Sequence, residues 1–310
     1  MKVLLPDSIP LDLDLPGAVV YAVDQPVPPS LSDAEALVVW GNPADRLRSL
    51  ARDLTRVRWV QSLAAGPDAV LAAGFGPDVV ITSGAGLHDQ TVAEHTLALV
   101  LAAARRLNLL VRAQVGHRWA AELGGLQPVR ETANFRTLRD AHVVIWGFGG
   151  IAATLAPHLA ALGARVTGVA RSAGTRHGFP VVTAADLPSV LPAADVLINI
   201  LPATDATRRI VDASTLARLP AHAWLINVGR GSTVDEDALL AALRAGRLAG
   251  AALDVFETEP LPPASPLWDE PNVLITPHAA GGRPLGAAER IRSNYEALLA
   301  DRPLAHVVQP

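Results

Sequence analysis

Residues 142–152 read HVVIWGFGGIA, an apolar run followed at once by closely spaced glycines. The run predicts a buried strand, and the composition after it predicts a helix. Gly147, Gly149 and Ala152 match the pattern G-x-G-x-x-G/A, which combines a tight turn, a close approach of backbone to pyrophosphate, and close packing of helix on strand. The amides expected to face the anion are those of Gly149, Gly150 and Ile151. The stretch predicts a Rossmann dinucleotide-binding unit, with a turn that binds nothing as the alternative.

The end of the next predicted strand bears on the choice of cofactor. A carboxylate about 20 residues beyond the glycines would bond the adenosine ribose, but this strand ends in VARS at 169–172. Arg171 and Ser172 are predicted to hold a 2′-phosphate, through charge-assisted and neutral hydrogen bonds respectively. NADP(H) is therefore favoured, and NAD(H) is the alternative. A solvated basic loop without cofactor preference, in which Arg176 also lies, is the competing interpretation.

Short runs of branched aliphatic residues recur on both sides of this stretch, with amphipathic segments between them. That alternation is typical of parallel sheets covered by helices. The first series lies at 3–5, 19–23, 36–40, 59–63 and 79–82. The second series lies at 142–146, 165–169, 196–200, 224–228, 251–255 and 273–276. Two α/β units, each with a parallel sheet, are expected.

The segments between the two series predict where the units divide. Residues 91–111 have helical composition without glycine or proline, which predicts one long helix leading into the second unit. After His278 a glycine-rich stretch precedes another helical segment, which is expected to return to the first unit. We therefore assign residues 1–90 and 283–310 to a substrate domain and residues 91–282 to a dinucleotide-binding domain.

Composition excludes several classes of protein. The 310 residues are 50% hydrophobic and 18% charged, which argues against disorder and favours two domains. The formal net charge of -4 disfavours a nucleic-acid partner. There is no cysteine, which excludes disulfides, thiolate zinc sites and cysteine nucleophiles, and we predict no metal site.

Two apolar stretches were compared with targeting and membrane segments, and neither has the pattern that such a segment requires. Pro6 and Asp7 interrupt the first one, so no signal peptide is predicted. The stretch 92–111 contains Glu94, His95 and two arginines, too many costly side chains for a lipid span. A cytoplasmic protein without a membrane partner is expected.

Three chemically distinct side chains follow predicted strands of the second unit: Arg230, Glu259 and His278. The carboxyl ends of strands border the ligand crevice in open α/β sheets. Histidine suits proton transfer to the oxygen of a ketone that accepts a hydride. A neighbouring glutamate would raise its pKa and orient its ring, and an arginine would bind the carboxylate of a keto acid. These residues predict reduction of a 2-keto acid, with Arg230 and His278 contacting the substrate.

Each of the three residues also has a simpler explanation. His278 could be an exposed imidazole at a strand end, and Glu259 a surface acid in a proline-rich turn. Arg230 could neutralise Asp235 or Glu236. Their joint occurrence at strand ends beside a dinucleotide loop favours one site over three unrelated residues.

Seven motifs, in order, resemble the D-isomer-specific 2-hydroxy acid dehydrogenase family over most of the chain. They are AAGPD at 64–68, VAEHTLALVLAAARRL at 92–107, GFGGIA at 147–152, LPATDAT at 201–207, INVGRG at 226–231, GAALDVFETEPLP at 250–262 and PLWDEPNVLITPHAAGG at 266–282. The resemblance implies a flavodoxin-like substrate domain, a Rossmann domain, a cleft between them and a homodimer.

The resemblance also implies roles for individual residues. The family's catalytic arginine, glutamate and histidine fall on Arg230, Glu259 and His278. The backbone of Ala65 and Gly66 would bind the substrate carboxylate. Residues expected to contact the cofactor are Leu201, Pro202, Thr207, Val228, Asp254 and Gly281. Among these, Asp254 would hold the nicotinamide carboxamide.

Departures from subfamily patterns narrow the chemistry. Formate dehydrogenases carry glutamine where this chain has Glu259, and phosphite dehydrogenases carry lysine where it has Ala65. The ARS sequence at 170–172 resembles glyoxylate/hydroxypyruvate reductases that prefer NADPH. The unusual stretch ITSGAGLHDQ leaves the shape of the substrate pocket open, and His88 and His95 are treated as structural.

Two other functions stay open at this point. A dinucleotide-sensing scaffold, similar to corepressors of this fold with vestigial catalysis, is one alternative. Another is a different Rossmann reaction such as amino-acid dehydrogenation. The intact trio argues against the scaffold, while the identity of the keto acid is not determined by these motifs.

Overall fold

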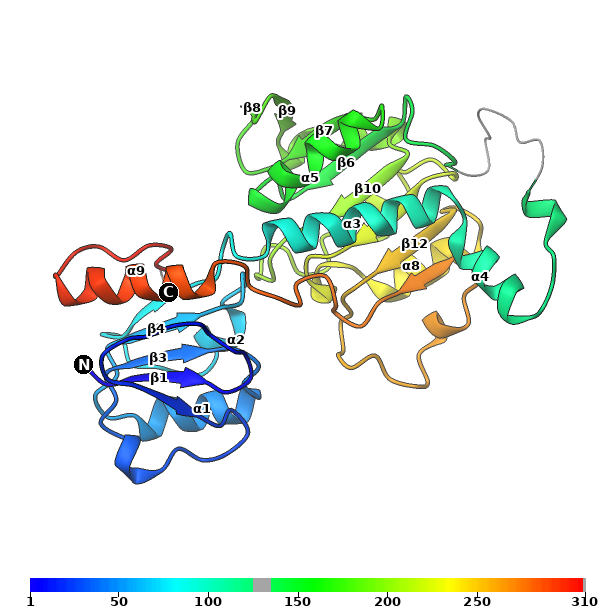
Figure 1. The fold of residues 1–310 in the computed structure, drawn as a ribbon. Helices are drawn as coiled ribbons and strands as arrows, with labels where there is room; N and C mark the ends of the chain where they lie inside the picture. Colours follow the sequence, from blue (N-terminus) through cyan, green and yellow to red (C-terminus); the bar gives the residue numbers. More distant parts are fainter. Residues whose placement is uncertain (125–134, 309–310) are drawn as a thin grey trace. The chain divides into compact units, whose positions relative to one another are not determined.

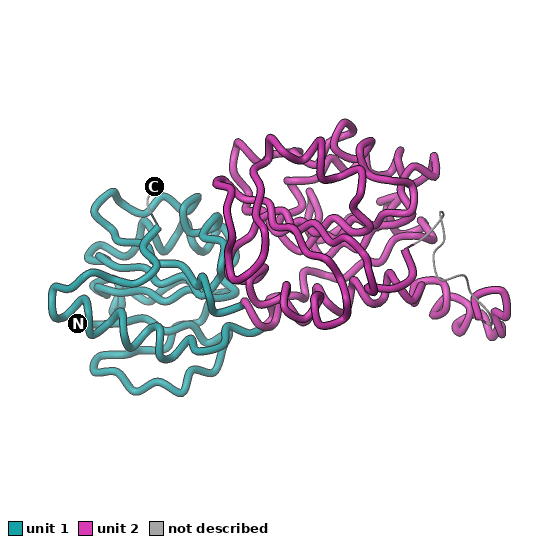
Figure 2. Tube along the Cα trace, turned by 90° about the horizontal axis from the view of Figure 1, so that it is seen from above, with its two compact units in different colours: residues 1–88, 283–310 teal, residues 89–282 magenta. Residues whose placement is uncertain are grey.

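The computed structural model describes residues 1–124 and 135–308, and the chain divides into two compact units. Unit 1 contains residues 1–88 together with the segment from Arg283 onward, and unit 2 contains residues 89–282 (Figure 2). The chain leaves unit 1 after His88 and returns to it at Arg283. Unit 1 is thus built from two segments that are distant in the sequence.

Unit 1 is a parallel sheet with helices on both faces. Its strands are β1 (Val3–Pro6), β2 (Ala18–Tyr21), β3 (Ala36–Val39), β4 (Trp59–Ser62) and β5 (Val80–Thr82). They pair in the order β2-β1-β3-β4-β5, the flavodoxin-like order. Alternating residues of β1 point to opposite cores, one shared with α1 (Ala44–Asp53) and α2 (Asp68–Leu71), the other with α9 (Ala287–Leu299).

Unit 2 is built on a longer sheet with a Rossmann strand order. Its strands are β6 (His142–Trp146), β7 (Arg165–Val169), β8 (Gly174–Arg176), β9 (Phe179–Val182), β10 (Val196–Asn199), β11 (Trp224–Asn227), β12 (Gly250–Leu253) and β13 (Val273–Ile275). The order is β13-β12-β11-β10-β6-β7-β9-β8, and β8 alone pairs antiparallel among these strands. The order reverses between β6 and β10, where open α/β sheets bind their ligands. The expected α/β fold with parallel sheets is confirmed.

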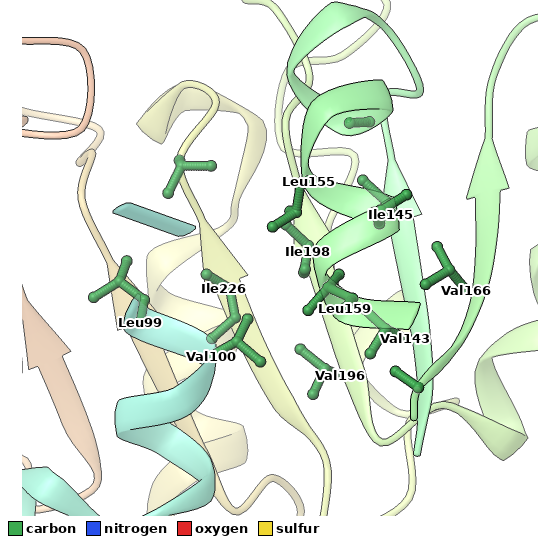
Figure 3. Close-up of a cluster of buried hydrophobic side chains, with 14 of the residues drawn as sticks. Leu99, Val100, Val143, Ile145, Leu155, Leu159, Val166, Val196, Ile198 and Ile226 are labelled. Carbon is green, nitrogen blue, oxygen red and sulfur yellow. The ribbon is translucent and has the colours of Figure 1, made fainter. Parts of the chain in front are cut away.

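Helices cover both faces of this sheet. On one face, α3 (Asp89–Ala104) packs beside α5 (Gly150–Ala161) (Figure 1). The other core includes residues of α6 (Leu187–Val190), α7 (Ala213–Leu216) and α8 (Glu236–Arg244). Figure 3 shows Leu99 of α3 and Leu155 of α5 among the strand residues of the first core. Each fully buried aliphatic chain of this kind contributes roughly 1.5–3 kcal/mol by leaving water.

Two local expectations were wrong or incomplete. The single helix predicted over 91–111 is broken: α3 ends at Ala104, Arg106 adopts a left-handed φ of 53°, and α4 (Leu107–Val115) follows. The break contains neither glycine nor proline, so local sequence does not mark it. The sequence does not predict the β8–β9 hairpin, because both strands are short, β8 contains only glycine and polar residues, and Pro180 lies in β9. Within the described residues, no helix combines the length and apolarity needed to cross a membrane.

Candidate active site

The glycine-rich turn after β6 has the geometry that its sequence predicts. Gly147 has a φ of 103°, and a Cβ there would lie 2.8 Å from the carbonyl oxygen of Ile200, just after the neighbouring strand β10. Gly149 caps α5, and within the described chain no heavy atom beyond its neighbours lies within 4 Å of where its Cβ would be. Ala152 is fully buried against the sheet. The turn thus leaves open space beside the first amides of a twelve-residue helix, which suits a pyrophosphate.

Gly150 lacks a side chain for a further reason, in addition to the predicted contact of its amide with the anion. A Cβ at Gly150 would lie 2.0 Å from Oδ2 of Asp89, the first residue of α3. The missing side chain therefore lets a carboxylate approach the positive end of α5, where negative charge is favourable. Ile151, the other predicted contact in this helix, is half-buried in its first turn.

Arg171 and Ser172 lie exposed in the segment after β7. Arg176 of β8 donates from Nη2 to Ser172 Oγ at 2.7 Å and to the Ser172 carbonyl oxygen at 3.2 Å. Its Nη1 donates to the carbonyl oxygen of Phe148, inside the glycine turn, at 3.3 Å. Sequence reasoning missed this bridge because it did not predict the hairpin that turns Arg176 back.

Buried amides support the arginine loop. Asn199 and Asn227 end two neighbouring strands, and Asn199 Nδ2 donates to Asn227 Oδ1 at 3.0 Å and to Thr233 Oγ1 at 2.6 Å. Thr233 Oγ1 and Asn227 Nδ2 both donate to the carbonyl oxygen of Arg230, at 2.6 and 3.3 Å. The signal for this network is the sequence LIN, which ends both strands and places a polar residue in a buried position.

Close backbone packing joins the arginine loop to the glutamate loop. A Cβ on Gly231 would lie 1.8 Å from the carbonyl carbon of Phe256, so only glycine fits there. The Phe256 amide in turn donates to Glu259 Oε1 at 2.8 Å. Arg230 directs Nη1 to the carbonyl oxygen of Gly229 at 2.9 Å. Two of the three predicted catalytic residues therefore stand on loops in direct contact.

Glu259 and His278 form the central pair of the site. His278 Nδ1 lies 2.7 Å from Glu259 Oε2, and the side chains are 48% and 34% exposed. A carboxylate accepts hydrogen bonds, so Nδ1 carries a proton and Nε2 is the nitrogen that takes up or releases one. The half-exposed ring can therefore exchange a proton with a bound molecule.

The charges around this pair shift both pKa values. The hydrogen bond to Glu259 raises the pKa of His278, outweighing burial and the nearby Arg230 guanidinium, which lower it. Burial alone would raise the pKa of Glu259, but the hydrogen bonds from His278 and the Phe256 amide bring it below its ordinary value. The geometry therefore favours a glutamate anion beside a histidine that holds its proton towards neutral pH.

Asp254 organises the loop that carries His278. Its carboxylate, in a residue only 1% exposed, accepts hydrogen bonds from Thr276 Oγ1 at 2.6 Å and from the amides of Ala279 and Ala280 at 2.8 and 3.1 Å. Its carbonyl oxygen accepts from the His278 amide at 2.8 Å. Burial would raise the pKa of Asp254, but these bonds and one from His95 lower it.

The remaining predicted cofactor contacts lie on loops of unit 2. Leu201 and Pro202 follow β10, and Thr207 Oγ1 closes that turn by donating to the Pro202 carbonyl oxygen at 2.6 Å. Val228 is buried after β11, and Gly281 is half-exposed in the loop beyond His278. All lie beyond the carboxyl ends of the strands that precede them.

In unit 1, Ala65 and Gly66 are half-buried in the turn between β4 and α2. His88 Nε2 donates to the carbonyl oxygen of Leu63 at 2.8 Å, and its ring stacks on Trp40 with centroids 5.4 Å apart. A Cβ on Gly84 would lie 2.1 Å from the same oxygen. His88 and Gly84 thus hold the start of this turn.

Comparison with known proteins gives a consistent result. Residues 97–280 match the profile of the D-isomer specific 2-hydroxyacid dehydrogenase family, NAD binding domain. Glyoxylate/hydroxypyruvate reductase A of Serratia proteamaculans is 34% identical over 284 residues, covering 89% of this chain and 86% of that protein.

Two crystal structures resemble the whole chain. A D-isomer specific 2-hydroxyacid dehydrogenase of Xanthobacter autotrophicus, in complex with NADPH, has a TM-score of 0.80 and 33% identity, covering 100% of this chain and 99% of that one. An NADPH-dependent glyoxylate/hydroxypyruvate reductase of Sinorhizobium meliloti, in complex with NADP, has a TM-score of 0.82 and 29% identity, covering 100% and 98%.

The ion pair predicts the titration of His278. In Glu259→Gln the carboxylate charge is lost while an amide oxygen stays available, so the pKa of His278 should fall to or below the ordinary histidine value. NMR titration of labelled histidine rings measures this, with His278→Ala assigning the resonance. Glu122→Gln, which changes an exposed acid, is the control. An unchanged His278 pKa in Glu259→Gln would contradict the described pairing.

Proposed function

Because the chain belongs to the D-isomer specific 2-hydroxyacid dehydrogenase family, we propose that it reduces a small 2-keto acid to the D-2-hydroxy acid with NADPH. Family membership establishes an NAD(P)-dependent hydroxyacid reductase. The observation that carries the finer proposal is the His278 pairing with Glu259 at 2.7 Å, on loops that contact the Arg230 loop. Arg230, Glu259 and His278 are then the catalytic residues.

The turn after β6 fits a dinucleotide. The open space at Gly149 and the amides of Gly150 and Ile151 would receive the pyrophosphate. Leu201, Pro202, Thr207, Val228, Asp254 and Gly281 would line the rest of the cofactor. When bound, the reduced nicotinamide supplies the hydride.

The catalytic residues would divide the remaining work. Arg230 would bind the substrate carboxylate, and its positive charge would polarise the carbonyl group so that negative charge gathers on the oxygen. His278 Nε2 donates a proton to that oxygen as it becomes a hydroxyl, and the reverse reaction returns the proton to Nε2. Glu259 keeps Nδ1 protonated and offsets the charge of the imidazolium. In unit 1, the backbone of Ala65 and Gly66 would bind a substrate carboxylate, as the family resemblance implies.

The substrate class follows from the relatives and from charge. Two of the three similar proteins named above are glyoxylate/hydroxypyruvate reductases. Arg230 can bind one carboxylate and His278 can protonate one carbonyl oxygen, which matches the two functional groups of a 2-keto acid. We therefore place glyoxylate and hydroxypyruvate first among the substrates.

NADP(H) is favoured over NAD(H) by three residues at the adenosine end. Arg171, Ser172 and Arg176 offer two guanidinium groups and a hydroxyl, and VARS at 169–172 lacks the carboxylate that would repel a 2′-phosphate. The guanidinium of Arg176 already contacts both Ser172 and the glycine turn, so it would need little rearrangement to reach a phosphate. The similar crystal structures hold NADPH or NADP.

A homodimer is supported by an apolar surface on α4. Leu107, Val111 and Val115 recur every four residues along the helix and are 44%, 54% and 75% exposed. Trp119, 93% exposed, follows the helix, and Trp268 lines a cleft of about 290 Å³ with Leu107 and Val111. Monomeric proteins seldom leave such a patch in water, and we propose that a second copy covers it.

Loss of the proton donor is the direct test of function. In His278→Ala the rate of NADPH oxidation with glyoxylate or hydroxypyruvate should fall by roughly 10²- to 10⁴-fold. Wild-type reduction should be fastest below the raised pKa of His278 and decline as pH rises through it, because the donor must be protonated. Exposed His158→Ala should behave as wild type. NADPH binding without turnover of any 2-keto acid would favour the dinucleotide-sensing scaffold.

Cofactor preference can be tested residue by residue. Arg171→Ala and Arg176→Ala should each raise the KM for NADPH by roughly 10- to 100-fold, the loss of one charge-assisted hydrogen bond, and leave the KM for NADH nearly unchanged. Arg165→Ala, an exposed arginine at the opposite end of β7, is the matched control. Equal losses for both cofactors would show that these arginines act on folding and not on the 2′-phosphate.

The apolar surface predicts the oligomeric state. Val111→Glu should convert the dimer to a monomer, because it would bury an unpaired carboxylate at the interface. Light scattering coupled to size exclusion measures the mass, with Val20→Glu, 65% exposed in unit 1, as the control. A Val111→Glu protein of unchanged dimeric mass would exclude this surface as the interface.

A further inference from the structure

His95 reaches the loop of His278 from a distant part of the chain. Its Nε2 lies 3.0 Å from Thr276 Oγ1 and 3.4 Å from Asp254 Oδ1, across a sequence separation of 181 residues in the first contact. The side chain is 22% exposed and projects from α3. It touches neither Glu259 nor His278 in the contacts described above, so any effect on proton transfer must pass through the loop.

The direction of the hydrogen bonds can be assigned. Thr276 Oγ1 has one proton, and it is donated to Asp254 Oδ1 at 2.6 Å because a carboxylate only accepts. Both neighbours of His95 Nε2 are therefore acceptors, and Nε2 must carry a proton. His95 thus donates through Thr276 to Asp254, a chain in which each bond polarises the next.

The carboxylate at the end of this chain holds the catalytic loop. Its three other donors, Thr276 and the amides of Ala279 and Ala280, all come from the loop itself. Among the described residues, His95 donates to this carboxylate from outside the loop, and it thereby links the loop to α3. In this loop His278 has a φ of 51°, a left-handed conformation that an L-residue keeps only when its surroundings hold it.

Chain topology adds a second consequence. α3 begins at Asp89, the first residue of unit 2, and the 276–280 loop lies just before the return to unit 1 at Arg283. The hydrogen bond from His95 to Thr276 therefore joins the two ends of the unit 2 segment.

We propose that His95 is a positioning residue for proton transfer, which fixes the 276–280 loop through Thr276 and Asp254 and so holds His278 against Glu259. This inference rests on the proposed function for its kinetic consequence. His95 contacts no reacting atom. Its contribution is to keep the ring of His278 within hydrogen-bond distance of the carboxylate and aimed at the substrate.

The test uses paired variants that remove or keep the donor. His95→Leu removes it, whereas His95→Gln places an amide N–H near the position of Nε2. Thr276→Val and Thr276→Ser make the same comparison with little change of volume. His142→Leu is the matched control, because His142, at the amino end of the central strand β6, makes a similar bond of 2.9 Å to Thr167 of β7.

Two readouts separate positioning from a general loss of stability. In His95→Leu and Thr276→Val, kcat should fall roughly 10- to 100-fold, and the Kd for NADPH should stay within about threefold. The alkaline limb of the pH profile and the NMR-measured pKa of His278 should both move down as the contact with Glu259 loosens. His95→Gln and Thr276→Ser should restore most of the kcat and most of the His278 pKa. His142→Leu should change neither kcat nor the pKa of His278.

The outcomes distinguish this inference from the proposed function. Wild-type kcat and His278 titration in His95→Leu, or equal losses in His95→Leu and His95→Gln, would overturn the positioning role. If the wild-type protein reduces no 2-keto acid, the proposed function fails. The NMR titration of His278 still decides the positioning role in that case, because it requires no turnover.

Discussion

Parallel strand pairing brings the carboxyl ends of β6, β10, β11, β12 and β13 to one edge of the unit 2 sheet, and every catalytic candidate depends on that alignment. Each strand contributes one loop to this edge. The loop after β6 makes room for an anion, the loop after β11 presents Arg230, the chain after β12 presents Asp254 and Glu259, and the loop after β13 presents His278. One backbone constraint thus gathers groups that are more than a hundred residues apart.

Close packing of these loops needs residues with little or no side chain. Gly147 and Gly229 both lie against the backbone of Ile200 and Leu201, and Gly231 lies against Phe256. Where loops do not touch directly, buried polar groups join them, as between Asn199 and Asn227 or between Asp254 and the 276–280 loop. Buried polar atoms are costly unless they are paired, so these networks favour one loop arrangement over others.

Electrostatic balance gives the site its chemical character. Two carboxylates, those of Glu259 and Asp254, lie near the imidazole of His278 and raise its pKa. The guanidinium of Arg230 also lies near His278. The same carboxylates would repel an anionic substrate, and Arg230 offsets them. This balance of charges suits a site that binds one negative charge and gives up one proton, which the proposed reduction of a 2-keto acid requires.

The sequence by itself determined the α/β class, the glycine turn, most strands and the three catalytic candidates, because those features are local: apolar periodicity, the absence of a side chain, and a reactive group just after a strand. Where a residue acts through a contact with a distant part of the chain, only the tertiary structure decided its role. Arg176 reaches Ser172 through a hairpin of weak local signal, α3 breaks at Arg106 without glycine or proline, and His95 meets Thr276 across 181 residues. Such contacts depend on strand register and helix packing, which are set by the whole fold and leave no periodic mark in the chain.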